Sequence, residues 1–132
     1  MNVSSLSYKN SHLWKKSGEL IEKTGSLEPL PDEPQNELFR QFKMAVFSIQ
    51  QDIQEAYSHH DQQFILYYFS KAKSSCLIVE EMLIKIGKTF PLEYYSEYLN
   101  RLDEMKSILD NYIHLSQINL SIENKRKGNQ QY

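Results

Sequence analysis

Apolar residues recur at intervals of three and four in four stretches of the chain, the spacing typical of amphipathic α-helices. The four stretches cover residues 9–25, 34–57, 62–87 and 91–120. Three prolines within residues 26–36 exclude a continuous helix there. The links at 58–61 and 87–90 are so short that we expect consecutive helices to reverse direction. The pattern therefore predicts an all-α fold, an antiparallel up-down four-helix bundle.

The ends of the predicted helices carry residues that are typical of helix termini. Gly25 and Gly87 can end the first and third helices, because glycine adopts the left-handed conformation of a C-terminal cap at little cost. Asp61 can accept hydrogen bonds from free amide groups at the start of the third helix, and Pro91 suits the first turn of the fourth. We expect a flexible N-terminus over residues 1–8, one bundle over 9–120 and a flexible basic tail over 121–132.

Composition narrows the class of protein without naming a function. The chain has 132 residues, typical of one domain and long enough for one hydrophobic core. Its formal net charge is −2, so a basic surface for nucleic acid would have to be local. Cys76 is the only cysteine, and its apolar neighbours favour burial over a redox role. No signal peptide and no apolar run of about 20 residues is present, so we expect a cytoplasmic protein with no membrane contact.

A search for catalytic and metal-binding motifs finds none. A glycine-rich phosphate loop, a serine-centred elbow and an H-E-x-x-H pair are all missing. Di-iron bundles carry E-x-x-H repeats, which neither the acidic pair Asp52 and Glu55 nor the pair Glu80 and Glu81 provides. The adjacent histidines at 59–60 lack further ligands and favour a solvated corner. We therefore expect no enzyme activity, no metal and no cofactor.

Basic and aromatic residues leave two questions open. The candidates for phosphate contact are Arg40, Lys43, Lys71, Lys73, Lys125, Arg126 and Lys127. Acids are interspersed among them, so the alternative is a solvated helix face without a ligand. The nine tyrosines exceed what one core face needs and favour an oligomer interface, where a ring can be buried with its hydroxyl in water. Ordinary packing at the edge of the core is the alternative.

Three of the predicted helices carry motifs similar to those of a known family. The first helix contains HLWKK over residues 12–16, and the second reads QFKMAVFSIQQDIQEA over residues 41–56. The third helix follows the family's spacing at Ile65, Tyr68, Phe69, Ala72, Ser74, Ser75, Val79 and Glu80. The stretch 38–80 resembles the bacterial four-helix-bundle proteins encoded in intervening sequences of 23S ribosomal RNA, which are related to the accessory variability protein of diversity-generating retroelements.

The resemblance implies a homo-oligomer, a ring of five copies, that in some members binds nucleic acid through a basic surface. It also draws attention to polar residues of the second and third helices. Ser48, Ala72 and Ser75 are small enough to let these two helices approach closely. Glu55 and Glu80 become candidates for polar contacts between helices, and a buried carboxylate there needs partners.

The chain departs from the family pattern at several positions of the second helix, and some of these departures lose positive charge. Lys43 and Met44 stand where the family has paired arginines. Asp52 replaces an asparagine, and Ala56 replaces a glycine. Fewer cations mean fewer contacts with phosphate. Two functions therefore stay open: a non-catalytic, homo-oligomeric bundle that binds RNA or DNA, and a protein–protein interaction module of the same fold that binds no nucleic acid.

Overall fold

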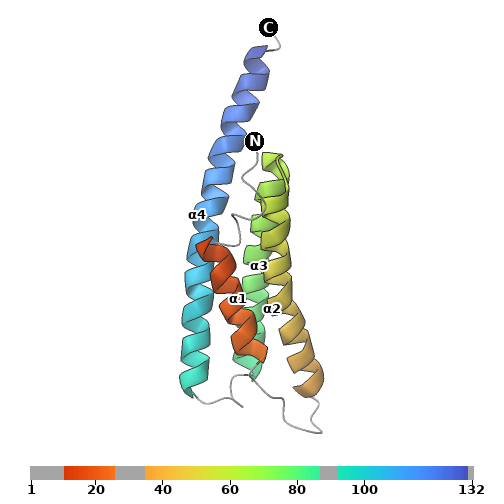
Figure 1. Cartoon of the computed structure of the whole chain (residues 1–132), viewed down its shortest axis with the longest axis vertical. Helices are drawn as coiled ribbons and strands as arrows, with labels where there is room; N and C mark the ends of the chain where they lie inside the picture. The colour runs from red at the N-terminus through yellow and green to blue at the C-terminus, as the bar shows by residue number, and fades with distance from the viewer. Residues whose placement is uncertain (1–10, 26–34, 87–91, 131–132) are drawn as a thin grey trace.

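Four α-helices pack against one another in the computed structural model, which describes residues 11–25, 35–86 and 92–130 (Figure 1). The helices are α1 (His12–Gly25), α2 (Gln35–Ser58), α3 (Gln62–Ile86) and α4 (Leu92–Gln130). The described residues contain no strand. The largest interfaces join α2 with α3 and α3 with α4, while the shorter α1 packs against α2 and α4. The predicted all-α class with four packed helices is therefore confirmed.

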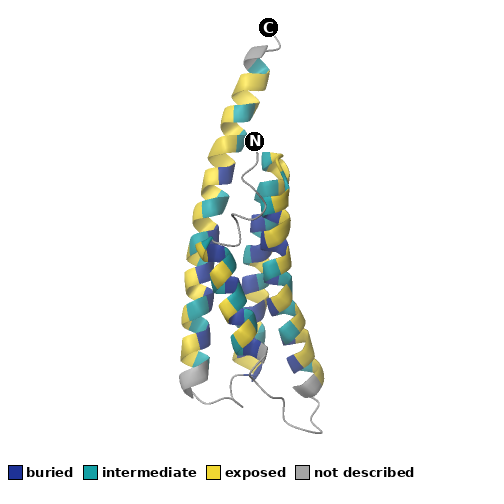
Figure 2. Ribbon diagram, in the orientation of Figure 1, coloured by how far each residue is buried: buried dark blue, intermediate teal, exposed yellow. Residues whose placement is uncertain are grey.

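The apolar stripes of the four helices meet in one core that runs along the molecule (Figure 2). The larger buried side chains in it are Leu13, Leu20, Phe42, Ile49, Ile53, Leu83, Tyr98, Leu102, Met105 and Leu109. The ring centroids of Phe42 and Tyr98 lie 5.5 Å apart, and Tyr112 stacks on Phe69 at 5.2 Å. Each large apolar side chain buried in this way contributes about 2 kcal/mol to folding, which makes the core the main source of stability.

Short polar side chains satisfy amide groups at two helix starts. The Asp61 carboxylate accepts a hydrogen bond from the Gln63 amide at 2.9 Å, as predicted for the cap of α3. The Ser11 hydroxyl accepts from the Trp14 amide at 3.1 Å, so α1 begins after Ser11 and not at the predicted residue 9. The predicted flexible segment 1–8 and the residues Gly87 and Pro91 lie outside the described ranges.

The end of α4 corrects a prediction. Residues 121–132 were expected to form a flexible tail, but α4 continues as helix to Gln130 and reaches beyond the ends of α2 and α3 (Figure 1). The physical reason is that polarity alone does not stop a helix: this segment holds no proline, and its first glycine is Gly128. Among the described helices, none has the length and hydrophobicity needed to cross a membrane.

Candidate functional site

Two of the four predicted phosphate-binding cations of α2 and α3 are paired with carboxylates alone. Arg40 donates two hydrogen bonds to the Glu37 carboxylate, from Nη2 to Oε1 at 2.5 Å and from Nε to Oε2 at 3.1 Å. This contact lowers the pKa of Glu37 and raises the pKa of Arg40, chiefly through the hydrogen bonds between them. The Lys73 ammonium lies 2.5 Å from Asp110 of α4. Each pair presents little net charge to a ligand, so these positions do not form a free basic surface.

The other two cations of α2 and α3 contact aromatic rings. The Lys43 ammonium lies over the Phe39 ring, 4.9 Å from its centroid. The Lys71 ammonium lies 6.0 Å from the centroid of Tyr68 and 3.5 Å from Oδ1 of Asp52. Cation–π contacts of this kind hold a cation against the protein and are worth about 0.5–1 kcal/mol at an exposed site.

Polar residues line the interface of α2 and α3. The Ser48 and Ser75 hydroxyls lie 3.4 Å apart, and Ser48 also donates to the Ala45 carbonyl at 2.7 Å. Glu80 was expected at an interface between helices, and the structure places it 2.5 Å from Lys106 of α4. Glu55 was expected at one too, but it is exposed on α2, 3.6 Å from the His59 imidazole.

Asp52 is the polar residue of α2 that the sequence argument did not select. It is only 5% exposed, and its Oδ2 has no hydrogen-bond partner, while Lys71 lies beside Oδ1. Burial raises the pKa of this carboxyl against the opposing effect of Lys71. A buried acceptor without a partner costs about 1–3 kcal/mol. Its position on the core-facing stripe of α2, between Ile49 and Ile53, was the signal that could have found it.

A ladder of ion pairs joins α1 to α4 and was also missed. Lys16 lies 2.7 Å from Glu104, and Lys23 lies 2.7 Å from Glu97. Arg101 reaches back across the same interface to Glu19 at 2.6 Å. Three cations face three carboxylates in this ladder, so their charges balance within the molecule and the ladder helps to fix the position of α1.

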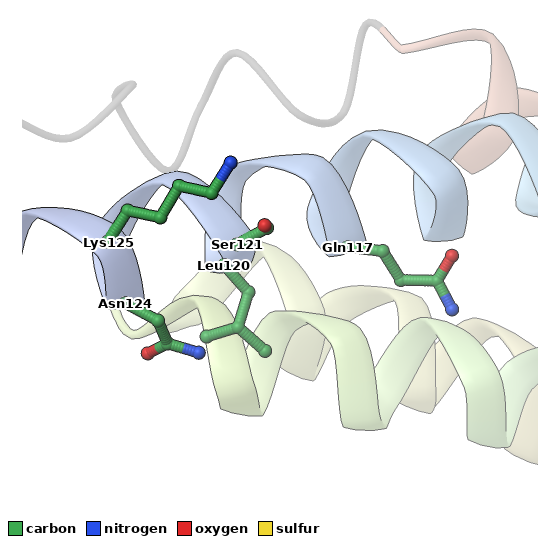
Figure 3. Close-up of a pocket in the computed structure, with 5 residues that line it drawn as sticks. All are labelled: Gln117, Leu120, Ser121, Asn124 and Lys125. Carbon is green, nitrogen blue, oxygen red and sulfur yellow. The ribbon is translucent and has the colours of Figure 1, made fainter.

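The basic end of α4 is different from the other cationic positions. Lys125, Arg126 and Lys127 are all exposed. Among the residues that the structure describes, none forms an ion pair with them. A shallow hollow beside them is lined by Gln117, Leu120, Ser121, Asn124 and Lys125. All five come from α4, and Leu120 points toward the neighbouring helices while Lys125 points away (Figure 3).

The described residues hold no group of three or more His, Cys, Asp or Glu side chains placed to bind a metal ion. Cys76 is buried in the core, where desolvation raises the pKa of its thiol to about 12. A thiol in this state is a packing residue and a poor nucleophile.

The chain was compared with protein-family models, with curated proteins and with solved structures, and nothing matches it in any of the three.

Proposed function

We propose that the protein is a non-catalytic, homo-oligomeric four-helix bundle of the cytoplasm that binds RNA or DNA, in keeping with its resemblance to the ribosomal RNA intervening-sequence proteins. The observation that carries the nucleic-acid part is the exposed basic end of α4. Lys125, Arg126 and Lys127 follow one another at the end of a helix that projects from the bundle. Adjacent unpaired cations are the groups that replace counterions on a phosphate backbone.

The proposed course of the chain is antiparallel, up and down. Its support is the order of contacts: Ser48 meets Ser75 and Asp52 lies beside Lys71, so numbers rise along α2 as they fall along α3. The same inverse order holds for α3 with α4 and for α1 with α4, in the pairs Lys73–Asp110, Glu80–Lys106, Lys16–Glu104 and Lys23–Glu97. The Figure 1 colour gradient agrees, since α2 and α4 rise through the view and α3 descends.

Self-association is supported by apolar surface and not by tyrosine. Of the described tyrosines, Tyr67 is the one whose ring is mostly exposed, which favours core packing for the rest. Other large apolar side chains are exposed instead: Met44, Phe47, Phe64, Leu77, Ile78, Ile84, Leu115, Ile118 and Ile122. Surface of this kind is typical of a chain that associates, and a ring of five copies is the assembly that the resemblance implies.

The proposal is tested by retention on a mixed RNA and DNA column as salt is raised. Replacing Lys125, Arg126 and Lys127 with glutamine should lower the salt needed for elution, because about three phosphate contacts are lost. The matched control replaces Arg40, Lys71 and Lys73, which removes the same charge from positions already paired with acids. Equal loss in both variants, or no retention of the wild type, contradicts the proposal.

A protein–protein interaction module of the same fold is the second candidate. It is favoured by the pairing of Arg40, Lys71 and Lys73 with acids, which removes most of the cationic surface expected on α2 and α3. A pull-down after nuclease treatment tests it. Recovery of a distinct protein supports this candidate, and recovery of the chain alone counts against it.

A further inference from the structure

Three apolar side chains form a stripe on the projecting part of α4. Leu115, Ile118 and Ile122 are spaced by three and four residues and are 54%, 43% and 44% exposed. This is the a and d spacing with which one helix packs against another. Their three side chains therefore share one side of α4, which we name the outer stripe.

The outer stripe continues the side of α4 that α1 covers lower down. One step of seven residues leads back from Leu115 to Ile108, which is partly buried. Glu104 and Glu97, on the same side of α4, pair with residues of α1. Because Lys16 lies at the level of Glu104, α1 begins near the level of Ile108. From there α4 continues past α1 (Figure 1), and the exposure of the stripe shows that it is left uncovered.

A helix in this situation needs a partner. Isolated helical segments shorter than about 12–15 residues are marginal in water, and packing of an apolar face is what stabilises them. Beyond Leu115, α4 has 15 further residues, to Gln130, and their core-facing positions become polar, with Ser116 and Glu123 following Leu109 at intervals of seven. The apolar residues that remain on this segment to hold it are largely those of the outer stripe.

We propose that the outer stripe packs against the outer stripe of a second copy, with the two α4 helices antiparallel and crossing at Ile118. Charge selects this orientation. A parallel pair would place two sets of Lys125, Arg126 and Lys127 side by side, and like charges repel. An antiparallel pair places the two basic ends at opposite ends of the contact and so avoids this repulsion.

The remaining geometry fits the same arrangement. Asn119 and Ser121 flank the stripe and carry no charge, so two identical surfaces meet no repulsion at these positions. With Ile118 at the centre, residue 128 of one copy lies opposite residue 108 of the other. The end of each α4 thus stops where α1 of the other copy begins, and about 20 residues of each helix, roughly 30 Å, lie in contact.

This inference rests on the proposed self-association. The contact is two-fold, so it differs from the head-to-tail contacts within a ring of five and would join copies that belong to different rings. It is tested with Ile118→Cys under mild oxidation. In an antiparallel pair centred on residue 118, residue 118 of one copy lies opposite residue 118 of the other. A disulfide between them requires Cβ atoms about 3.5–4.5 Å apart. The variant should form a disulfide-linked dimer at least about tenfold faster than Asn100→Cys, an exposed position lower on α4 that lies outside the proposed contact and meets its copy only in random collisions.

Two further variants complete the design. Cys76 is buried, so the unmodified chain provides a background without cross-linking. Ile122→Cys should link no faster than Asn100→Cys, because residue 122 meets residue 114 in an antiparallel pair. Fast linking of Ile122→Cys means a parallel pair and overturns the proposal.

Light scattering on the wild type separates the possible failures. If the wild type is an oligomer but Ile118→Cys fails to cross-link, the antiparallel α4 contact is contradicted and the proposed self-association is not. If the wild type is a monomer, both the α4 contact and the proposed self-association are contradicted. A monomer in which Ile118→Glu weakens retention on polynucleotide assigns the stripe to nucleic acid and also overturns the second-copy proposal.

Discussion

The two halves of α4 share one helix and differ in which side is apolar. In the lower half, Leu102 and Leu109 are fully buried against the other helices. Two more steps of seven residues reach Ser116 and Glu123, which are polar, while Leu115 and Ile122 are apolar on the other side. The lower half therefore belongs to the bundle, and the upper half carries the surface on which association and phosphate binding are proposed. Continuity of the helix says nothing about continuity of its packing.

The largest expected effect compares truncations in the two halves. Leu102→Ala should lower the free energy of unfolding by about 2–5 kcal/mol, because it leaves a cavity in the core. Ile118→Ala should change it by less than about 0.5 kcal/mol at a dilution where the chain is monomeric, because it removes an exposed side chain. Urea unfolding followed by circular dichroism measures both. Similar losses would mean that the upper half of α4 packs within the monomer.

A second prediction concerns Asp52 in the α2–α3 interface. Its pKa is raised on folding, so the native state holds a proton more tightly than the unfolded chain. The stabilisation that this proton provides is present below the unfolded value of 3.8 and is lost as pH rises through the folded pKa. Unfolding free energy should therefore contain a component that falls with rising pH above 3.8, on the order of 1 kcal/mol.

Asp52→Asn should remove this component. Glu55→Gln is the matched control, since Glu55 is exposed and lies on the same helix. Urea midpoints from pH 4 to pH 7 provide the comparison, and an unchanged pH slope in Asp52→Asn would contradict the assignment to this carboxyl.

The smallest expected effect is at the α1–α4 ladder. Arg101→Gln removes the contacts of Arg101 with Glu19 and Glu97 and should cost no more than about 1 kcal/mol, because the pairs are partly solvated. The loss should shrink in high salt, where exposed charges are screened. A cost of several kcal/mol that does not depend on salt would show that Arg101 contributes through packing.

Sequence patterns predicted the helices well where local chemistry marks their ends. The predicted third helix, residues 62–87, differs by one residue from α3, Gln62–Ile86. The agreement at its start follows from the cap at Asp61. The range 34–57 compares with Gln35–Ser58 for α2. The end of α4 was wrong because neither proline nor an early glycine marks it, and a polar sequence was taken for a flexible one.

The candidate site was harder to predict because it depends on contacts between helices. Whether Lys73 is free or paired is decided by Asp110, which is 37 positions away and meets it only through the register of α3 and α4. The same holds for Glu19 and Arg101. Spacing along one helix identifies which cations share a face, but not which acids the neighbouring helix brings to them.

The single tryptophan of the chain lies on α1, the shortest of the four helices. Trp14 packs partly against the core, and its amide hydrogen bond to Ser11 starts the helix. Indole fluorescence therefore reports on this one element, while the far-ultraviolet signal comes mostly from the three longer helices. If α1 can detach before the others melt, the emission of Trp14 will shift to longer wavelength ahead of the loss of helicity, so that two optical signals resolve a step that either alone would merge.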